Sequence, residues 1–211
     1  YIERLHSYLI PLIKQLHFQF PETQIIVAIN GYHNAPKQHA FLKEIHTFLD
    51  QYSTVSYFDY IEPHGLCTLW NGIVLRSETE KMLLCNEDLK TSRAFRTHLE
   101  ASGIFSHDFA LINGSYSHFM ISKKMMKEVG WFDERFPGIG YEDHDYEIRM
   151  AIKGHEVTQV NVAGLKNETA VPKDWSYGDD HSVIFGKYSG PNGDHYFKKW
   201  DISKTPKEGY T

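Results

Sequence analysis

The chain has 211 residues and a formal net charge of −5, and no basic run offsets this charge, which excludes a nucleic-acid binder that works by bulk electrostatics. Its 41% apolar and 23% charged residues are typical of one soluble globular domain with a sizeable core, and no apolar stretch is long enough to cross a bilayer. Two cysteines are too few for a disulfide framework, so we expect a reducing, cytoplasmic setting.

The first half of the chain predicts helices alternating with buried strands. Apolar residues recur at helical spacing over residues 5–16, with Pro11 as a kink. The apolar run at 24–29 ends in Asn30-Gly31, as expected for a buried strand followed by a turn. The further elements expected here are a helix at 37–49, a strand at 54–60, a helix at 65–76 and a strand at 81–85. This order predicts an open, mostly parallel α/β sheet, which binds ligands at the carboxyl ends of its strands.

The second half is less regular. It predicts strands at 109–112, 118–121 and 155–162, a helix at 122–129 between Ser122 and Gly130, and a helix at 141–153 ended by Gly154. We expect residues 164–211 to form an irregular, aromatic-rich extension of the same domain. Its rings would either cover the core or line an acceptor site, and covering the core is the more common role.

The first candidate site follows the buried strand at 81–85. Asn86, Glu87 and Asp88 come directly after this strand, and a carboxylate pair there can coordinate a hard divalent cation that bridges two phosphates. The alternative is a polar turn in which Asp88 caps the next helix.

The second candidate site opens the helix predicted at 141–153. Glu142, Asp143 and Asp145 would stabilise a helix start through its dipole, with Asp145 and Arg149 as an i,i+4 pair. Alternatively, one of these carboxylates accepts a proton from an attacking hydroxyl. The glycines at 138 and 140 favour the second interpretation, since they let the backbone approach a ligand closely.

Two motifs resemble the GT-A fold glycosyltransferases, especially the large inverting family of the family-two type. Residues 130–136, Gly-Trp-Phe-Asp-Glu-Arg-Phe, resemble that family's Gly-x-Phe-Asp-Glu-x-Phe segment. Residues 142–149 match its Glu-Asp-x-Asp-x-x-x-Arg pattern, and Gly65 and Asn71 resemble the stretch that leads into its metal-binding triplet. The resemblance extends over residues 24–162.

The resemblance implies a GT-A-like open mixed sheet flanked by helices and a role for each matching residue. Asp88 would be the main ligand of a Mn²⁺ or Mg²⁺ ion, Glu87 would help to position the metal and diphosphate, and His181 is a candidate further ligand. Asp143 would be the catalytic base, with Glu142 as an acceptor-binding residue or alternative base. The donor would also contact Asn30, Asn86, Gly114 and Ser115.

The sequence departs from the family pattern at two points. Asn86 stands where the triplet has its first aspartate, which weakens the metal prediction. The family's opening strand would have to precede Tyr1, and a sheet without this central strand would have unpaired strand edges. We therefore expect residues 1–211 to be a single GT-A-like domain without its first strand.

These features predict an inverting, metal-assisted glycosyltransferase of polysaccharide biosynthesis. The donor would be a UDP-, GDP- or dTDP-linked sugar, and the acceptor a hydroxyl of a glycan, lipid-linked saccharide or protein. The alternative is a catalytically impaired nucleotide- or glycan-binding domain on the same scaffold, which Asn86 motivates. A nucleotidyltransferase would need a glycine-rich phosphate loop, which the sequence lacks.

Overall fold

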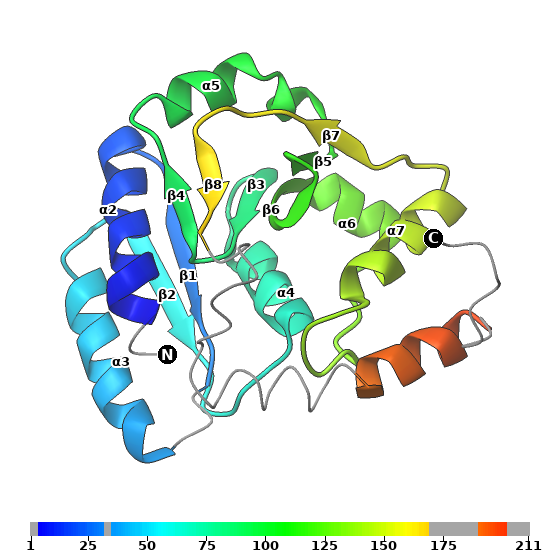
Figure 1. Cartoon of the computed structure of the whole chain (residues 1–211), viewed down its shortest axis with the longest axis horizontal. Coiled ribbons are helices and arrows are strands. Elements are labelled where there is room, and N and C mark those ends of the chain that lie inside the picture. The colour runs from blue at the N-terminus through cyan, green and yellow to red at the C-terminus, as the bar shows by residue number, and fades with distance from the viewer. Residues whose placement is uncertain (1–3, 32–34, 169–189, 202–211) are drawn as a thin grey trace.

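The computed structural model describes residues 4–31, 35–168 and 190–201, with only the backbone at 35–37 (Figure 1). Its helices are η1 (Leu5–Leu9), α2 (Ile10–Gln19), α3 (Ala35–Leu49), α4 (Leu66–Arg76), α5 (Phe95–Ala101), η2 (Ile104–Ser106), α6 (Lys123–Val129) and α7 (Glu142–Ile152). Its strands are β1 (Ile25–Ile29), β2 (Val55–Asp59), β3 (Lys81–Cys85), β4 (Leu89–Thr91), β5 (Phe109–Ile112), β6 (Ser115–Ser122), β7 (Thr158–Val160) and β8 (Leu165–Asn167). Residues 190–199 form one more helix.

The strands form a mixed α/β arrangement, as predicted. β1 and β2 pair in parallel, β3-β6-β5-β7 form a four-stranded sheet, and β4 pairs with β8. β6 runs antiparallel to both β3 and β5, whereas β5 and β7 are parallel. Antiparallel pairing is therefore more frequent among these strands than predicted, because the hairpin between β5 and β6 lies in the middle of the larger sheet.

An apolar cavity separates the β1–β2 pair from the four-stranded sheet. Among the described strands, β1 pairs only with β2, and β3 pairs only with β6. A cavity of about 470 Å³ lies between them, lined by both strands and by α2 and α4, with Leu16, Ile26, Trp70 and Leu83 on its walls. Among the described strands, β1 and β3 therefore each have one unpaired edge, and the two edges face this cavity.

The N-terminal helix changes its geometry immediately before a proline. Pro11 lies in the first turn of α2, and the preceding residues form the π-helix η1. Because proline has no N–H and its ring crowds the preceding turn, a regular α-helix cannot continue through it unchanged. Leu5 is buried against α3, and the Gln15 side chain accepts a hydrogen bond from the Thr91 backbone N–H at 3.0 Å. These contacts fix the N-terminal arm, residues 4–19, against α3 and β4.

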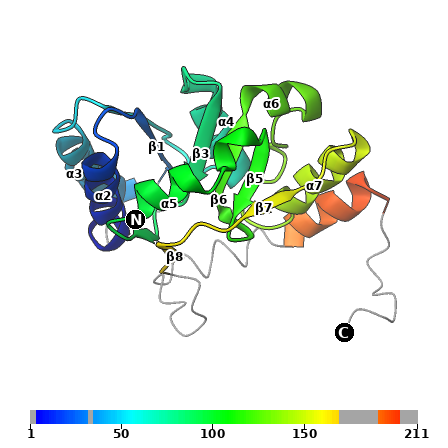
Figure 2. The same cartoon turned by 90° about the horizontal axis from the view of Figure 1, so that it is seen from above.

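The C-terminal region is more regular than predicted. β7 covers only three residues of the strand expected at 155–162, and the expected irregular extension contains β8 and the helix at 190–199. Both views place this helix beside α7, at the opposite end of the molecule from α2 and α3 (Figures 1 and 2).

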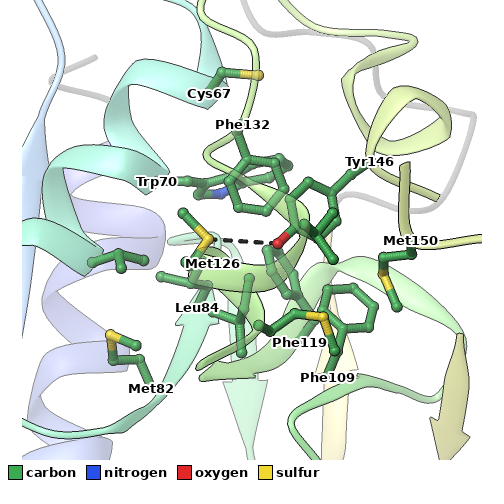
Figure 3. Close-up of a cluster of buried hydrophobic side chains, with 14 of the residues drawn as sticks. Cys67, Trp70, Met82, Leu84, Phe109, Phe119, Met126, Phe132, Tyr146 and Met150 are labelled. Carbon is green, nitrogen blue, oxygen red and sulfur yellow. Dashed lines mark hydrogen bonds between the residues drawn. The ribbon is translucent and has the colours of Figure 1, made fainter. Parts of the chain in front are cut away.

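The largest core cluster joins α4, the β3–β6 region, α6 and α7 (Figure 3). Phe132 stacks on Tyr146 with ring centroids 4.3 Å apart, and Trp70 lies 5.0 Å from Phe132. The Tyr146 hydroxyl donates to the Met126 sulfur at 3.6 Å. Phe132 is therefore a core residue, and its packing fixes the start of the loop that follows it.

Candidate active site

The start of β6 brings several predicted site residues together. Cys85 at the end of β3 pairs with His118, and the Asn86 N–H donates to the Ser117 carbonyl at 2.8 Å. The Asn113-Gly114 turn between β5 and β6 has positive φ at both residues, 52° and 70°, as in a two-residue type I′ hairpin. Asn86 therefore lies beside the start of β6, in the same region as Gly114 and Ser115.

Glu87 and Asp88 are paired with an arginine from the N-terminal arm. Asp88 is only 4% exposed, and its Oδ2 accepts from Nη2 of Arg4 at 3.2 Å. The Arg4 Nε donates to Glu87. Asp88 does not cap a helix, because the residue after it begins β4 and the N-cap of α5 is Ala94. The capping interpretation of Asp88 is therefore wrong, whereas its burial next to a cation is consistent with a site that holds positive charge.

His118 is a site residue that the sequence analysis missed. Its side chain is buried, and its Nδ1 has no hydrogen-bond partner within the described part of the chain. Burial lowers the pKa of His118, while the nearby Asp88 carboxylate partly opposes this shift. The position of His118 beside Asp88 follows from the β3–β6 register, which the sequence alone does not provide.

Glu142 and Asp143 occupy different environments. Glu142 is 5% exposed, and its Oε2 finds no hydrogen-bond partner among the described residues. Burial, with a smaller contribution from the Asp143 charge, raises the pKa of Glu142 to about 7. Asp143 is half-buried, and its Oδ1 accepts from the His144 N–H at 2.9 Å. Tyr141, the N-cap residue, has a φ of 71° and makes no side-chain cap. Capping alone therefore does not explain the burial of Glu142.

The acidic segments at Asp88 and at Asp143 each contribute to the pKa of a residue in β6. Burial raises the pKa of Tyr116, and the charges of Glu147 and Asp143 raise it further. His118 lies two residues further along the same strand, and the charge of Asp88 acts to raise its pKa. Residues i and i+2 of a strand lie on the same face, roughly 7 Å apart. Asp88 and Asp143 thus each influence a residue in the first half of β6, although 55 positions separate the two acids in the sequence.

Two other acids, Asp145 in the second motif and Asp133 in the first, have structural partners. Asp145 is fully buried, and its Oδ2 accepts from Nε of Arg149 at 3.0 Å, which confirms the predicted i,i+4 pair. Arg149 also donates to the Val129 and Trp131 carbonyls, so it ties α7 to the end of α6.

Asp133 pairs with Arg135 and Lys199 at 2.8 Å each and with His195 at 3.2 Å. Burial acts to raise the pKa of Asp133, but these hydrogen bonds outweigh it and hold the pKa well below its usual range.

Asn71 in α4 and Gly65, which precedes α4, contact the loop at residues 130–141, which joins α6 to α7 and is called the motif loop below. The Asn71 amide accepts from the Phe132 N–H at 3.1 Å and donates to the Phe132 carbonyl at 2.9 Å. A Cβ at Gly65 would lie 2.3 Å from the Phe136 carbonyl oxygen, so only glycine fits there. The resemblance at these two positions therefore reflects the support of the loop.

The remaining predicted site residues have different outcomes. The Asn30 side chain bonds to the backbone of His64, accepting from its N–H at 2.8 Å and donating to its carbonyl at 2.9 Å. Asn30 therefore fixes the loop that leads into α4, and its contact with the donor stays a prediction. Ser115 Oγ accepts from the Ser117 N–H at 3.1 Å. His181 lies outside the described residues.

A divalent cation fits the donor chemistry of this site only in part. Glu87 and Asp88 supply carboxylate oxygens, which are the ligands that Mg²⁺ and Mn²⁺ prefer. Within residues 4–31, 35–168 and 190–201, no three His, Cys, Asp or Glu side chains come together to form a metal site. The two carboxylates thus match a cation that takes its other ligands from a bound diphosphate and water.

In the same described ranges, no helix is long and apolar enough to span a membrane.

The model of the family described as "Glycosyltransferase like family 2" matches residues 70–172, slightly less than half of the chain. GalNAc-T7, solved with UDP, GalNAc and Mn²⁺, superposes with a TM-score of 0.54 at 10% identity, covering 94% of this chain and 49% of that one. The catalytic domain of Drosophila β1,4-galactosyltransferase 7 with xylobiose gives 0.41 at 11% identity, covering 65% and 64%. A mutant of the Drosophila enzyme with manganese, UDP-Gal and xylobiose gives 0.46 at 11% identity, covering 89% and 82%. No curated protein matches the sequence.

The GalNAc-T7 superposition supports the fold, and this chain spans about half of that protein. The fold is similar to that of a GT-A glycosyltransferase, and a glycosyltransferase family model matches just under half of the chain, in agreement with the class predicted from the sequence. Within that class, the chain resembles the glycosyltransferase-like family 2, and the match includes both the Asn86–Asp88 segment and the Glu142–Arg149 motif.

Proposed function

We propose that this protein transfers a sugar from a nucleoside-diphosphate donor to an acceptor hydroxyl with inversion at the anomeric carbon. The observation that supports the proposal is that Asp143 and Asp88 influence the pKa values of Tyr116 and His118, two residues on one face of the first half of β6. An in-line displacement needs the departing diphosphate and the attacking hydroxyl on opposite sides of one carbon atom. In this proposal the Asp88 segment would hold the departing diphosphate and the Asp143 segment would hold the attacking hydroxyl.

Glu142 or Asp143 would accept the proton from the acceptor hydroxyl. The raised pKa of Glu142, about 7, suits a general base, because a base is most effective when its pKa lies near the working pH. Asp143 is the more accessible of the two and lies beside Glu142 on the helix start. The charge of Asp143 contributes to the raised pKa of Glu142, so the two carboxyls are coupled, and we assign the base to this pair.

The diphosphate would lie near Glu87 and Asp88. A Mn²⁺ or Mg²⁺ ion held there would neutralise charge on the leaving group, and the Asn113-Gly114 turn and Ser115 would line the donor sugar. We propose a UDP-, GDP- or dTDP-linked donor and a carbohydrate-type acceptor, in polysaccharide biosynthesis. The free thiols of Cys67 and Cys85 are consistent with a cytoplasmic setting.

We further propose that the domain contains one more strand than the described structure. The apolar cavity lies between an edge of β1 and an edge of β3, and each of these strands has one partner among the described strands. An added strand in the cavity would join the two strand groups into one sheet.

A second candidate function, nucleotide or glycan binding without turnover, is favoured by the Arg4 ion pairs. Arg4 already pairs with both carboxylates that the metal would need. A protein that only binds would release no diphosphate from any donor, whereas the proposed enzyme would do so in the presence of Mn²⁺.

The test is release of nucleoside diphosphate from UDP-, GDP- and dTDP-sugars, with Mn²⁺ and with EDTA, and with a panel of saccharide acceptors. Glu142→Gln and Asp143→Asn keep the side-chain shape but remove the basic oxygen. We expect at least one of them to reduce turnover by about a hundredfold to ten-thousandfold while donor binding stays nearly unchanged. Turnover within a few fold of the wild type in both variants would refute the base assignment.

A further inference from the structure

The helix at residues 190–199 forms ion pairs with Asp133 in the motif loop and with Asp145 in α7. Lys199 Nζ donates to Asp133 Oδ2 at 2.8 Å and to Asp145 Oδ1 at 2.6 Å, so one ammonium group joins the loop to the helix that follows it. The indole Nε1 of Trp200 donates to the same Asp145 oxygen at 2.9 Å. Because Asp145 is fully buried, its charge requires such partners inside the protein.

The first turn of the same helix contacts the middle of the loop. Asn192 is fully buried, and its Nδ2 donates to the Gly140 carbonyl at 2.9 Å. A Cβ at Gly193 would lie 3.2 Å from the Tyr141 ring, so the helix backbone approaches this ring closely. The Tyr196 ring packs on Tyr141 with centroids 5.1 Å apart. The residues contacted, Gly140 and Tyr141, directly precede Glu142 in the sequence.

The loop needs support of this kind because its backbone is unusual at the same point. Gly140 and Tyr141 have φ values of 109° and 71°, and the left-handed region is unfavourable for a residue such as tyrosine. No side chain caps the start of α7. The direction in which Glu142 and Asp143 leave the loop is therefore set by contacts from outside it, and the helix at 190–199 provides several of them.

We propose that the helix at residues 190–199 holds the base-bearing loop in its working position, and that Asn192 and Lys199 are positioning residues for the transfer reaction. The inference rests on the proposed function, because it assigns a task relative to the base pair Glu142 and Asp143. Neither Asn192 nor Lys199 contacts the reacting atoms; they act through Gly140, Asp133 and Asp145.

The structure supplies a matched pair of lysines for the test. Lys199→Met removes the bridging ammonium, whereas Lys198→Met makes the same change at an exposed neighbour in the same helix. The fold should survive Lys199→Met, because Asp133 keeps Arg135 and His195 and Asp145 keeps Arg149 and Trp200. Asn192→Ala tests the other end of the helix.

We expect Lys199→Met and Asn192→Ala each to lower kcat by about ten- to a hundredfold with little change in the donor KM, since a misplacement of about 1 Å costs that much in rate. Amide hydrogen exchange at residues 138–145 should become faster in both variants. Lys198→Met should match the wild type in both measurements, and Lys199→Arg should recover part of the lost rate.

The inference is overturned if Lys199→Met behaves like Lys198→Met in rate and in exchange at residues 138–145. Hydrogen exchange also separates this inference from the proposed function. If no donor is turned over by the wild type but exchange changes as expected, the proposed function fails while the positioning contact stands. If turnover depends on Glu142 or Asp143 but is indifferent to Lys199 and Asn192, only the positioning inference fails.

Discussion

Asn71→Leu should destabilise the protein through the backbone of Phe132. The Asn71 side chain is 7% exposed and makes two hydrogen bonds with the Phe132 backbone, at 2.9 and 3.1 Å, and a third with Glu134 at 2.8 Å. Leucine has a similar volume but leaves the Phe132 N–H and carbonyl without these partners. An unsatisfied buried polar group costs about 1–3 kcal/mol, so the two groups should cost about 2–6 kcal/mol. The greater apolar burial of leucine offsets roughly 1 kcal/mol of this cost, which leaves a net loss of about 1–5 kcal/mol.

Urea unfolding followed by circular dichroism measures this loss, and the denaturant slope should stay unchanged. In a chain of this size, the same loss lowers Tm by about 2–4 °C per kcal/mol. Asn161→Leu is the matched control, because Asn161 is exposed. A free energy of unfolding within about 0.5 kcal/mol of the wild type for Asn71→Leu would refute the role of this amide in supporting the motif loop.

Two further predictions concern the charged groups of the site. Because the folded pKa of Glu142, about 7, lies above its ordinary value of 4.5, the folded state binds a proton that the unfolded state has lost. Stability should therefore fall as pH rises from about 4.5 to 7, by up to about 3 kcal/mol. Glu142→Gln should remove this fall, and an unchanged pH dependence of urea unfolding would contradict the buried position of Glu142. Arg4→Gln should strengthen Mn²⁺ binding by about tenfold, because the cation no longer competes with a guanidinium for Glu87 and Asp88. Calorimetry with MnCl₂ measures this change, Arg96→Gln at a surface ion pair is the control, and weaker binding in Arg4→Gln would reverse the assignment.

The sequence predicted the elements with strong patterns. Apolar runs located β1, β2, β3 and β5, and helical periodicity located α3, α4 and α7, because burial on one or both faces dictates these patterns. The three-residue strands β4 and β8 were missed, since so few residues carry no measurable period. The short helix α5 was expected only as the helix that follows Asp88, without bounds. The helix at 190–199 was missed because glycine, proline and polar residues dominate its first turn.

The two motifs were recognised in the sequence, but the different surroundings of their acidic residues were not predicted. Asp133 and Asp145 look as suited to catalysis as Glu142 in the sequence, yet the structure pairs them with Lys199, Arg135 and Arg149. The Lys199 pairs join segments more than fifty residues apart, so no local pattern encodes them, whereas the Asp145–Arg149 pair follows from its i,i+4 spacing. The same applies to Arg4, which reaches Asp88 across 84 positions, and to His118, which depends on the strand register.

The central claim is that Asp88 belongs to a cation-dependent diphosphate site beside β6. Calorimetric titration of the protein with UDP, GDP and dTDP, in Mn²⁺ and in EDTA, tests it most directly, with Asp88→Asn as the variant. The account predicts that at least one of these nucleotides binds in Mn²⁺, and that its affinity falls by about tenfold or more both in EDTA and in Asp88→Asn, as expected for the loss of a charged interaction. Binding that is indifferent to both changes, or the absence of binding by all three nucleotides, would contradict it.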